Sequence, residues 1–317
     1  MNFNCFLGVD VSKLKLDFAD SKNHLRGQVE NSRDGVAKLI QRLPEPQSVL
    51  IVLEATGGYE KTLVNQLLDA GHLVALVNPR KVRAFAIGIG ILAKTDAIDA
   101  LVIANFGEKV RPRTLAQKHE KQDDLDQLVT RRRQLVELRK AENCRLQNVV
   151  HKAVRKSLLQ TIKLFDKQIL ALEKEMTTLI ESDDEWNDKA QLLSSVPGVG
   201  DVTARTLIAE VPELGQLNRQ EIAALIGVAP FNRDSGKFKG KRTIFGGRAG
   251  VRSALYMAAV TAASHNPVIK AFYDRLKSQG KACNTIRIAC ARKLLVILNT
   301  MVKNNSHWNP HPSCQNA

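Results

Sequence analysis

The sequence predicts an α/β domain, followed by a long helical arm and a mostly helical C-terminal domain. Strand and helix patterns alternate over the first third of the chain, which is typical of a layered α/β fold. Glycine and proline are then absent from residues 113–196, and helical patterns dominate the rest. The expected boundaries are 1–112 for the α/β domain, 113–185 for the arm, 186–303 for the C-terminal domain and 304–317 for a disordered polar tail.

Apolar runs bounded by turn residues predict five strands in the α/β domain. The connections between the first three are short, which favours an antiparallel meander. The expected strands are 4–10, 14–20, 25–30, 48–54 and 73–78. The expected helices are 34–43, 59–70, 81–90 and 96–108.

A heptad repeat of apolar residues marks the second half of the arm. The repeat consists of Leu158, Ile162, Phe165, Ile169, Leu172, Met176 and Leu179. We therefore expect two long helices over residues 120–183, in a coiled-coil hairpin or a dimerisation arm. A local bundle that packs on its own chain is an equally good interpretation.

The C-terminal domain begins with LLSSVPGVGDVTARTLIAEV (192–211), which predicts a helix, a tight turn and a second helix. This pattern is similar to a helix-hairpin-helix, in which glycines such as Gly198 and Gly200 let the backbone approach a phosphate. A plain corner between two helices is the alternative. Three further helices are expected at 249–264, 267–278 and 283–303.

The net charge points to a polyanionic partner. Lysine and arginine number 47 against 32 acidic residues, so the formal net charge is +15. Such an excess favours DNA or RNA, although a soluble basic protein with another partner remains an alternative. No apolar run reaches membrane-spanning length, so a membrane partner is not expected.

The chain is expected in the cytoplasm. No signal peptide is recognisable at the N-terminus. The five cysteines are scattered and form no CxxC pair, so neither a zinc site nor a disulfide framework is expected. This cysteine usage fits a reducing compartment.

Four carboxylates occupy positions that invite a functional interpretation. Asp10 lies inside the apolar run FLGVDV, and Glu54 directly follows VLIVL. Asp96 and Asp99 are three residues apart, so they share one face of a helix. Taken singly, each has a plain explanation: a hydrogen-bonded turn for Asp10, a surface ion pair for Glu54 and helix capping for the other two.

Together, these four acids suggest a metal site. If they converge, their charge of −4 needs compensation, which two divalent cations would supply. Oxygen-rich sites of this kind suit Mg²⁺, with Mn²⁺ as a possible substitute. Two such ions can promote the displacement at a phosphoryl group.

A basic, glycine-rich segment over residues 227–252 predicts a flexible loop that contacts a phosphate backbone. Its basic residues are Arg233, Lys237, Lys239, Lys241, Arg242, Arg248 and Arg252. Ser235 lies in the middle of this segment. From its chemistry alone, such a serine more often donates a hydrogen bond to phosphate than acts as a nucleophile.

Three segments resemble the signatures of the bacterial DEDD-type insertion-sequence transposases and the related Piv-type DNA invertases. These segments are GVDVSK, LEATGGYE and KTDAIDA. The PGVG turn, the segment GVAP and the tripeptide Asp234-Ser235-Gly236 extend the resemblance, which covers roughly residues 4–300. It implies a RuvC-like domain of the RNase H type. It also implies that Asp10, Glu54, Asp96 and Asp99 are the catalytic, metal-binding acids and that Ser235 is the nucleophile.

The resemblance further implies a recombinase that cleaves and exchanges DNA strands, with serine from one subunit completing the acidic site of another. A homodimer or homotetramer and a structured guide RNA are then expected partners. One rival is a metal-dependent nuclease of the Holliday-junction type, with water as the nucleophile. The other is a nucleic-acid-binding protein without enzymatic activity.

Overall fold

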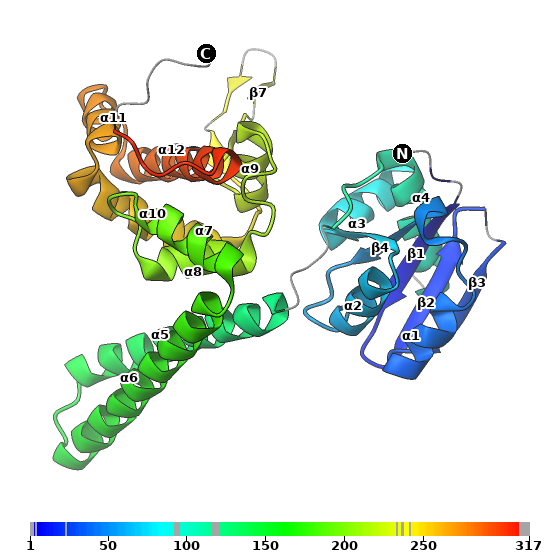
Figure 1. The fold of residues 1–317 in the computed structure, drawn as a ribbon, viewed down its shortest axis with the longest axis horizontal. Helices are drawn as coiled ribbons and strands as arrows, with labels where there is room; N and C mark the ends of the chain where they lie inside the picture. The colour runs from blue at the N-terminus through cyan, green and yellow to red at the C-terminus, as the bar shows by residue number, and fades with distance from the viewer. Residues whose placement is uncertain are drawn as a thin grey trace. The chain divides into compact units, whose positions relative to one another are not determined.

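The computed structural model describes residues 3, 5–22, 24–91, 96–115, 121–232, 234–235, 238–240 and 242–310, without the side chains of 96–98, 234–235 and 238–239. Contacts within the chain divide it into two compact units, Met1–Lys118 and His119–Ala317 (Figure 1). The first unit ends six residues beyond the expected boundary at 112 (118 − 112), between the fourth and fifth helices.

A mixed five-stranded sheet forms the centre of the first unit, with the strand order β3-β2-β1-β4-β5 (Figure 1). The first three strands form an antiparallel meander, whereas β4 runs parallel to both β1 and β5. The five predicted strands and the meander are thus confirmed. The strands are β1 (Cys5–Val11), β2 (Lys15–Asp20), β3 (Arg26–Glu30), β4 (Val49–Glu54) and β5 (Leu73–Val77).

Helices cover the sheet, and apolar clusters lie on both of its faces. On one face, Leu7, Val9 and Leu53 pack with side chains of α1 and α2. On the other, Phe6 and Val52 pack with side chains of α3 and α4. Burial on both faces explains the continuous apolar run VLIVL of β4. These elements are α1 (Arg33–Ile40), η1 (Pro46–Ser48), α2 (Lys61–Asp69), α3 (Pro79–Gly88) and α4 (Asp96–Val110).

A long helical hairpin opens the second unit, in which α5 (Gln122–Gln147) packs along α6 (Lys152–Glu181) (Figure 1). The prediction of two long helices is confirmed. Met176 and Ile180 share a buried cluster with Leu125 and Val129 of α5. The heptad side of α6 therefore packs against α5 of the same chain, and a coiled-coil or dimerisation role for the arm stays a prediction.

The remaining helices share one core with the base of this hairpin, so the arm is not a separate packing unit. They are α7 (Asp184–Ser194), α8 (Asp201–Glu210), α9 (Arg219–Ile226), α10 (Ala249–His265), α11 (Pro267–Ser278) and α12 (Cys283–Asn304). Among the described residues, no helix combines the length and apolar character needed to cross a bilayer.

The start of the polar tail differs from its expected disorder. The backbone N–H of Trp308 donates a hydrogen bond to Oγ of Ser195 at 3.2 Å, and the partly buried Trp308 ring packs on the core of the second unit. Burial of a large aromatic surface stabilises this otherwise polar segment. Residues 311–317 lie outside the described part of the chain.

Candidate active site

Two of the four predicted acids lie side by side on neighbouring parallel strands. The last register pair of β1 and β4 is Val9 with Leu53, so Asp10 and Glu54 occupy the next position of each strand. Both side chains are half-buried. Because side chains alternate along a strand, Glu54 shares the sheet face of Val52, which packs on the α3 and α4 side.

Helix α4 brings the third acid to this face. It packs across β1, β2 and β4. Its approach to β4 is close, because a Cβ built on Gly107 would lie 2.7 Å from Cγ2 of Val52. Asp99 lies in the first turn of this helix, at the end near the acids of the sheet.

Three of the predicted acids line one cavity of about 390 Å³: Asp10, Glu54 and Asp99. The remaining lining residues come from α3 and α4 and are Pro79, Val82, Arg83, Ala86 and Val102. Asp96 is the first residue of α4, and its side chain lies outside the described part of the structure.

Arg83 is a cavity residue that the sequence interpretation missed. Asn78 caps α3 with its side-chain oxygen, which accepts a hydrogen bond from the backbone N–H of Arg80, and Pro79 follows at the first helical position. This start places Arg83 one turn into the helix, beside the acids. The signal in the sequence is the segment NPRKVR, which directly follows a strand that ends at the same sheet edge as Glu54.

The donor chemistry of the cavity suits a hard divalent cation. Carboxylate oxygens are the ligands that Mg²⁺ and Mn²⁺ prefer. Among the described side chains, no group of three or more His, Cys, Asp or Glu residues is arranged to hold a metal ion. Mg²⁺ is commonly bound by one or two carboxylates together with water and substrate phosphates, so the three acids fit a site that substrate completes.

The turn after Glu54 is held by a second carboxylate. Glu60 accepts hydrogen bonds from the backbone N–H of Gly58 at 2.8 Å, and from Oγ1 and the N–H of Thr56 at 3.0 and 3.2 Å. Burial alone would raise the pKa of Glu60, but these hydrogen bonds outweigh it and hold the pKa below its ordinary value. The ionised carboxylate therefore fixes the chain where it leaves β4.

Ser235 lies on a β-ribbon of the second unit, which corrects the expected flexible loop. Strands β6 (Pro230–Phe231) and β9 (Thr243–Ile244) pair antiparallel, and so do β7 (Asp234–Ser235) and β8 (Phe238–Lys239). Phe231 and Thr243, two residues with strand preference, lie opposite each other and support this pairing. The side chain of Ser235 is outside the described part.

One predicted phosphate contact has a structural role instead. The Arg248 guanidinium donates to both carboxylate oxygens of Glu213, at 2.7 and 2.6 Å, and to the carbonyl oxygen of Glu210 at 2.8 Å. These bonds tie the start of α10 to the end of α8, and they use three of the five N–H donors of the guanidinium.

The other basic residues of the ribbon are only partly covered by the structure. Arg242 is exposed. Arg233, Lys237 and Lys241 lie outside the described residues, as does the side chain of Lys239. Their expected contact with nucleic acid therefore stays a prediction.

The two glycines of the PGVG turn differ in their surroundings. Gly198 has φ +99°, and a Cβ built there would lie 2.6 Å from the backbone of Ala262. Packing against α10 thus accounts for this glycine. A Cβ on Gly200, the N-cap of α8, would meet nothing within 4 Å, so this residue faces open space. The helices on both sides of the turn are confirmed, and contact between Gly200 and a phosphate stays a prediction.

Two family models match this chain. One, described as a transposase of the DEDD and IS110 type, matches residues 7–154, which include the acidic cavity. The other, described as the transposase IS116/IS110/IS902 family, matches residues 190–274, which include the serine ribbon. The fold, the acidic cavity and these matches define a transposase, an enzyme that acts on DNA. More particularly, the chain belongs to the IS110 family of bacterial insertion-sequence transposases, as its motifs predicted.

Two of the curated relatives cover nearly the whole chain, and others match about half of it. The chain is 29% identical over 314 residues to the pilin gene-inverting protein of Moraxella lacunata. The matched region covers 95% of this chain and 96% of that protein. The pilin gene-inverting protein of Moraxella bovis matches equally well. An insertion element IS110 protein of Streptomyces coelicolor is 25% identical over 154 residues, or 48% of this chain and 37% of that protein.

Proposed function

We propose that this transposase cleaves and exchanges DNA strands at the acidic cavity, with Ser235 as the nucleophile. The observation that carries the proposal is the placement of Asp10, Glu54 and Asp99 around one cavity, although they are far apart in the sequence. Such convergence is difficult to explain by capping or by isolated surface ion pairs. The pilin gene-inverting relatives support recombination rather than simple degradation.

The N-terminal unit is proposed to be a RuvC-like domain of the RNase H type. Its sheet, an antiparallel meander extended by two parallel strands, supports this assignment together with the motif resemblance. In this domain Asp10, Glu54, Asp96 and Asp99 would hold two Mg²⁺ ions. Mg²⁺ bound there would neutralise the carboxylates and polarise the phosphate oxygens.

Ser235 attacks a backbone phosphorus with its hydroxyl oxygen. A bond forms between Oγ and phosphorus while the bond to one DNA oxygen breaks, and the serine proton is lost as the released strand gains a hydroxyl end. The product is a phosphoserine-linked strand, and attack by another DNA hydroxyl reverses the chemistry and releases the serine. Family precedent suggests that the serine of one subunit serves the acids of another, in a dimer or a tetramer.

Arg83 is proposed to bind the phosphate that reacts. A guanidinium offers paired N–H donors that match phosphate oxygens. The charge balance supports this role: four carboxylates, two divalent cations and one guanidinium sum to +1 (−4 + 4 + 1), which a phosphodiester of charge −1 would neutralise. A structured guide RNA that selects the DNA sites remains part of the proposal through the family resemblance, and the charge of +15 is compatible with it.

The test is an assay for covalent protein–DNA adducts with the element's own end sequences, flanking RNA and Mg²⁺. We expect an adduct and recombinant junctions, both abolished by excess chelator and by Ser235→Ala. Ser278→Ala is the matched control, because among the described residues that exposed hydroxyl donates only to the carbonyl oxygen of Arg275. A nuclease that uses water would still cleave with Ser235→Ala and form no adduct. A non-enzymatic DNA-binding protein would function unchanged with Asp10→Ala.

A further inference from the structure

We propose that the outer face of α6 binds the phosphate backbone of double-stranded DNA. The surface, termed the lysine face, consists of Lys152, Lys156, Lys163, Lys167 and Lys174. The inference rests on membership of a family that acts on DNA. It does not depend on the proposed roles of Ser235 and the acids, so binding and cleavage can fail separately.

The five lysines form one continuous stripe along the helix. At about 100° per residue they fall within a sector of roughly 60°, and the 22 positions from first to last span roughly 33 Å. That length is close to one turn of B-form DNA, about 34 Å. Between Lys152 and Lys174 this sector contains no acidic residue. Glu181 lies in the same sector, but seven residues after the last lysine.

The charge of this face is not consumed within the protein. All five lysines are exposed, and none forms an ion pair or side-chain hydrogen bond with another described residue. The acids of α6 that border the face are instead paired with arginines of α5. Asp166 lies 2.7 Å from Arg139. Glu173 lies 2.6 Å from Arg132.

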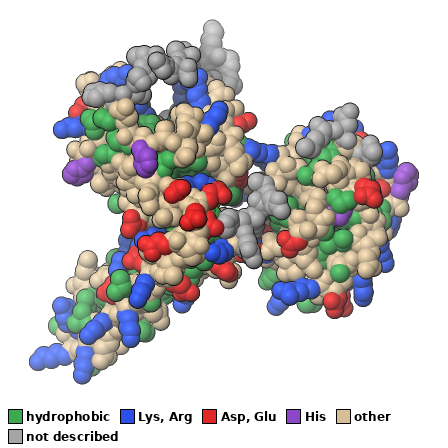
Figure 2. Space-filling model, viewed as in Figure 1, with side chains coloured by type: hydrophobic (Ala, Val, Ile, Leu, Met, Phe, Trp, Pro, Cys, Tyr) green, Lys and Arg blue, Asp and Glu red, His purple; other side chains and the backbone are tan. Residues whose placement is uncertain are grey.

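The tip of the hairpin adds to this positive surface. No Asp or Glu occurs in residues 143–165, whereas five basic residues do: Arg145, Lys152, Arg155, Lys156 and Lys163. Lys and Arg side chains accordingly gather at this end of the hairpin (Figure 2). Arg145 is paired with Glu142, whereas the charges of the other four residues would repel one another without an anionic partner.

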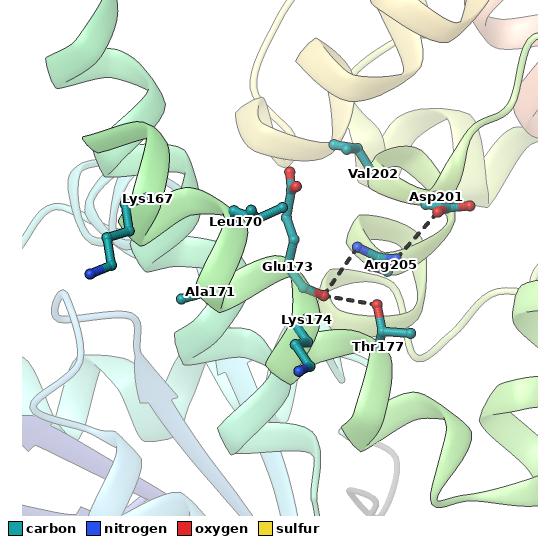
Figure 3. A pocket seen from close by; sticks show the side chains of 9 residues that line it. All are labelled: Lys167, Leu170, Ala171, Glu173, Lys174, Thr177, Asp201, Val202 and Arg205. Atoms are coloured by element: carbon teal, nitrogen blue, oxygen red, sulfur yellow. Dashed lines mark hydrogen bonds and ion pairs between the residues drawn. The ribbon is translucent and has the colours of Figure 1, made fainter. Parts of the chain in front are cut away.

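Two shallow hollows follow the lysine face. The first, of about 390 Å³, includes Lys152, Lys156 and Lys163 in its lining. The second, of about 660 Å³, lies between α6 and α8 and includes Lys167 and Lys174. In this second hollow, Lys167 and Lys174 extend away from the carboxylate of Glu173 (Figure 3).

The second hollow connects the lysine face to the PGVG turn. Asp201 and Arg205 of α8 line it as well, and the two form an ion pair at 3.3 Å (Figure 3). Gly200 directly precedes Asp201 and faces open space. A phosphate chain that runs along the lysines would therefore reach the backbone of the turn in which sequence analysis expected phosphate contact.

The composition of the face favours a duplex over a single strand. Leu170 lies between the lysines in the same sector, and Leu159 and Gln160 border it. Proteins that bind single strands stack bases on aromatic side chains, and this face has none among its described residues. A straight row of lysines instead matches the regular phosphates of a duplex backbone.

The test measures binding of a duplex of about 40 base pairs by fluorescence anisotropy, in EDTA and over a range of salt concentrations. Lys156→Gln/Lys163→Gln/Lys167→Gln should reduce the slope of log K against log salt by about 2.7, at about 0.9 for each lost phosphate contact. The matched control is Arg33→Gln/Lys38→Gln/Arg42→Gln, which removes the same charge from exposed residues at α1 of the first unit. It should leave the slope unchanged.

The inference would be overturned if the lysine variant and the wild type had equal slopes of log K against log salt. It would also be overturned if the control variant reduced this slope as much as the lysine variant does. Loss of binding to an RNA duplex, with DNA binding intact, would also contradict it. If the triple variant fails to fold by circular dichroism, each single substitution should still reduce the slope by about 0.9. Because the assay is run in EDTA, its result does not depend on the proposed metal-dependent chemistry, so a failure of this surface and a failure of the proposed cleavage can be told apart.

Discussion

Gly8 of β1 lies directly against the backbone of Ala100 in α4. A Cβ built on Gly8 would be 2.0 Å from the carbonyl oxygen of Ala100 and 2.4 Å from the backbone nitrogen of Ala104. A side chain at this position would push the helix away from the strand. Asp10 lies two residues after Gly8 on the same sheet face, and Asp99 immediately precedes Ala100. The missing side chain of Gly8 therefore lets the two acids face the same cavity.

Substitution of this glycine should damage the site as well as the fold. We expect Gly8→Ala to lower the free energy of unfolding by about 1–3 kcal/mol, the usual cost of overpacking. DNA cleavage should fall further than this loss of stability explains, because Asp99 moves with α4. Gly88→Ala is the control, since an added Cβ there meets nothing within 4 Å. Urea denaturation and cleavage assays that found Gly8→Ala equal to wild type would contradict the close packing.

Each acid of the cavity should be needed for cleavage and not for the fold. Asp10→Asn, Glu54→Gln and Asp99→Asn keep the shape of the side chain and remove its charge. We expect each to slow metal-dependent cleavage by at least about 100-fold, or roughly 2.7 kcal/mol in the barrier. DNA binding in EDTA should be unchanged or slightly tighter. Cleavage that survives any two of these substitutions would disprove a shared metal site.

Asp17 offers a matched control for the acid variants. It lies directly opposite Asp10 in the pairing of β1 and β2. Its Oδ1 accepts a hydrogen bond from Nε2 of Gln28 at 2.8 Å, and it is not part of the cavity lining. Asp17→Asn removes the same charge from a neighbouring strand, and it should retain cleavage within a few-fold.

The turn held by Glu60 should make stability depend on pH. Its hydrogen bonds lower the pKa in the folded state, so the ionised carboxylate stabilises the fold above its ordinary pKa, and this stabilisation is lost as the pH falls through the lowered value. We expect Glu60→Gln to be less stable than wild type by about 1–3 kcal/mol at neutral pH. The gap should narrow below about pH 4.

Urea denaturation of both proteins at neutral and acidic pH measures this gap. Glu45→Gln is the control, because its exposed side chain has no partner among the described residues. A gap that stayed constant down to acidic pH would show that Glu60 acts through packing and not through its charge.

Sequence patterns were sufficient to predict the helices and strands and to select most of the cavity carboxylates. Both depend on the periodicity of apolar residues within a short stretch of chain. Period-two and heptad patterns locate strands and helices, and a carboxylate that ends an apolar strand is visible as a break in the pattern. Arg83 was missed because the sequence shows a basic helix start in PRKVR but not which of its side chains lines the cavity. That choice depends on the angle at which α3 packs on the sheet.

Long-range pairing explains the remaining errors. The ribbon around Ser235 was taken for a flexible loop, since glycines and lysines hide two short pairings, one of Phe231 with Thr243 and one of Asp234 with Lys239. Arg248 was assigned to a phosphate because its partner Glu213 lies 35 residues away in the chain. When the partner of an ion pair is distant in the sequence, the sequence alone does not show that the charge is paired.

Arg83 should influence substrate and metal binding in opposite directions. If its guanidinium binds the reacting phosphate, Arg83→Gln should slow cleavage by about 10–100-fold, in line with roughly 1.5–3 kcal/mol for a hydrogen bond to a charged group, and Arg83→Lys should restore only part of this loss. Removal of the cation beside three carboxylates should also lower the Mg²⁺ concentration that half-maximally raises Tm. Arg80→Gln, at an exposed position of α3, should change neither quantity. Weaker Mg²⁺ binding in Arg83→Gln would instead indicate that the arginine merely holds the acids in place.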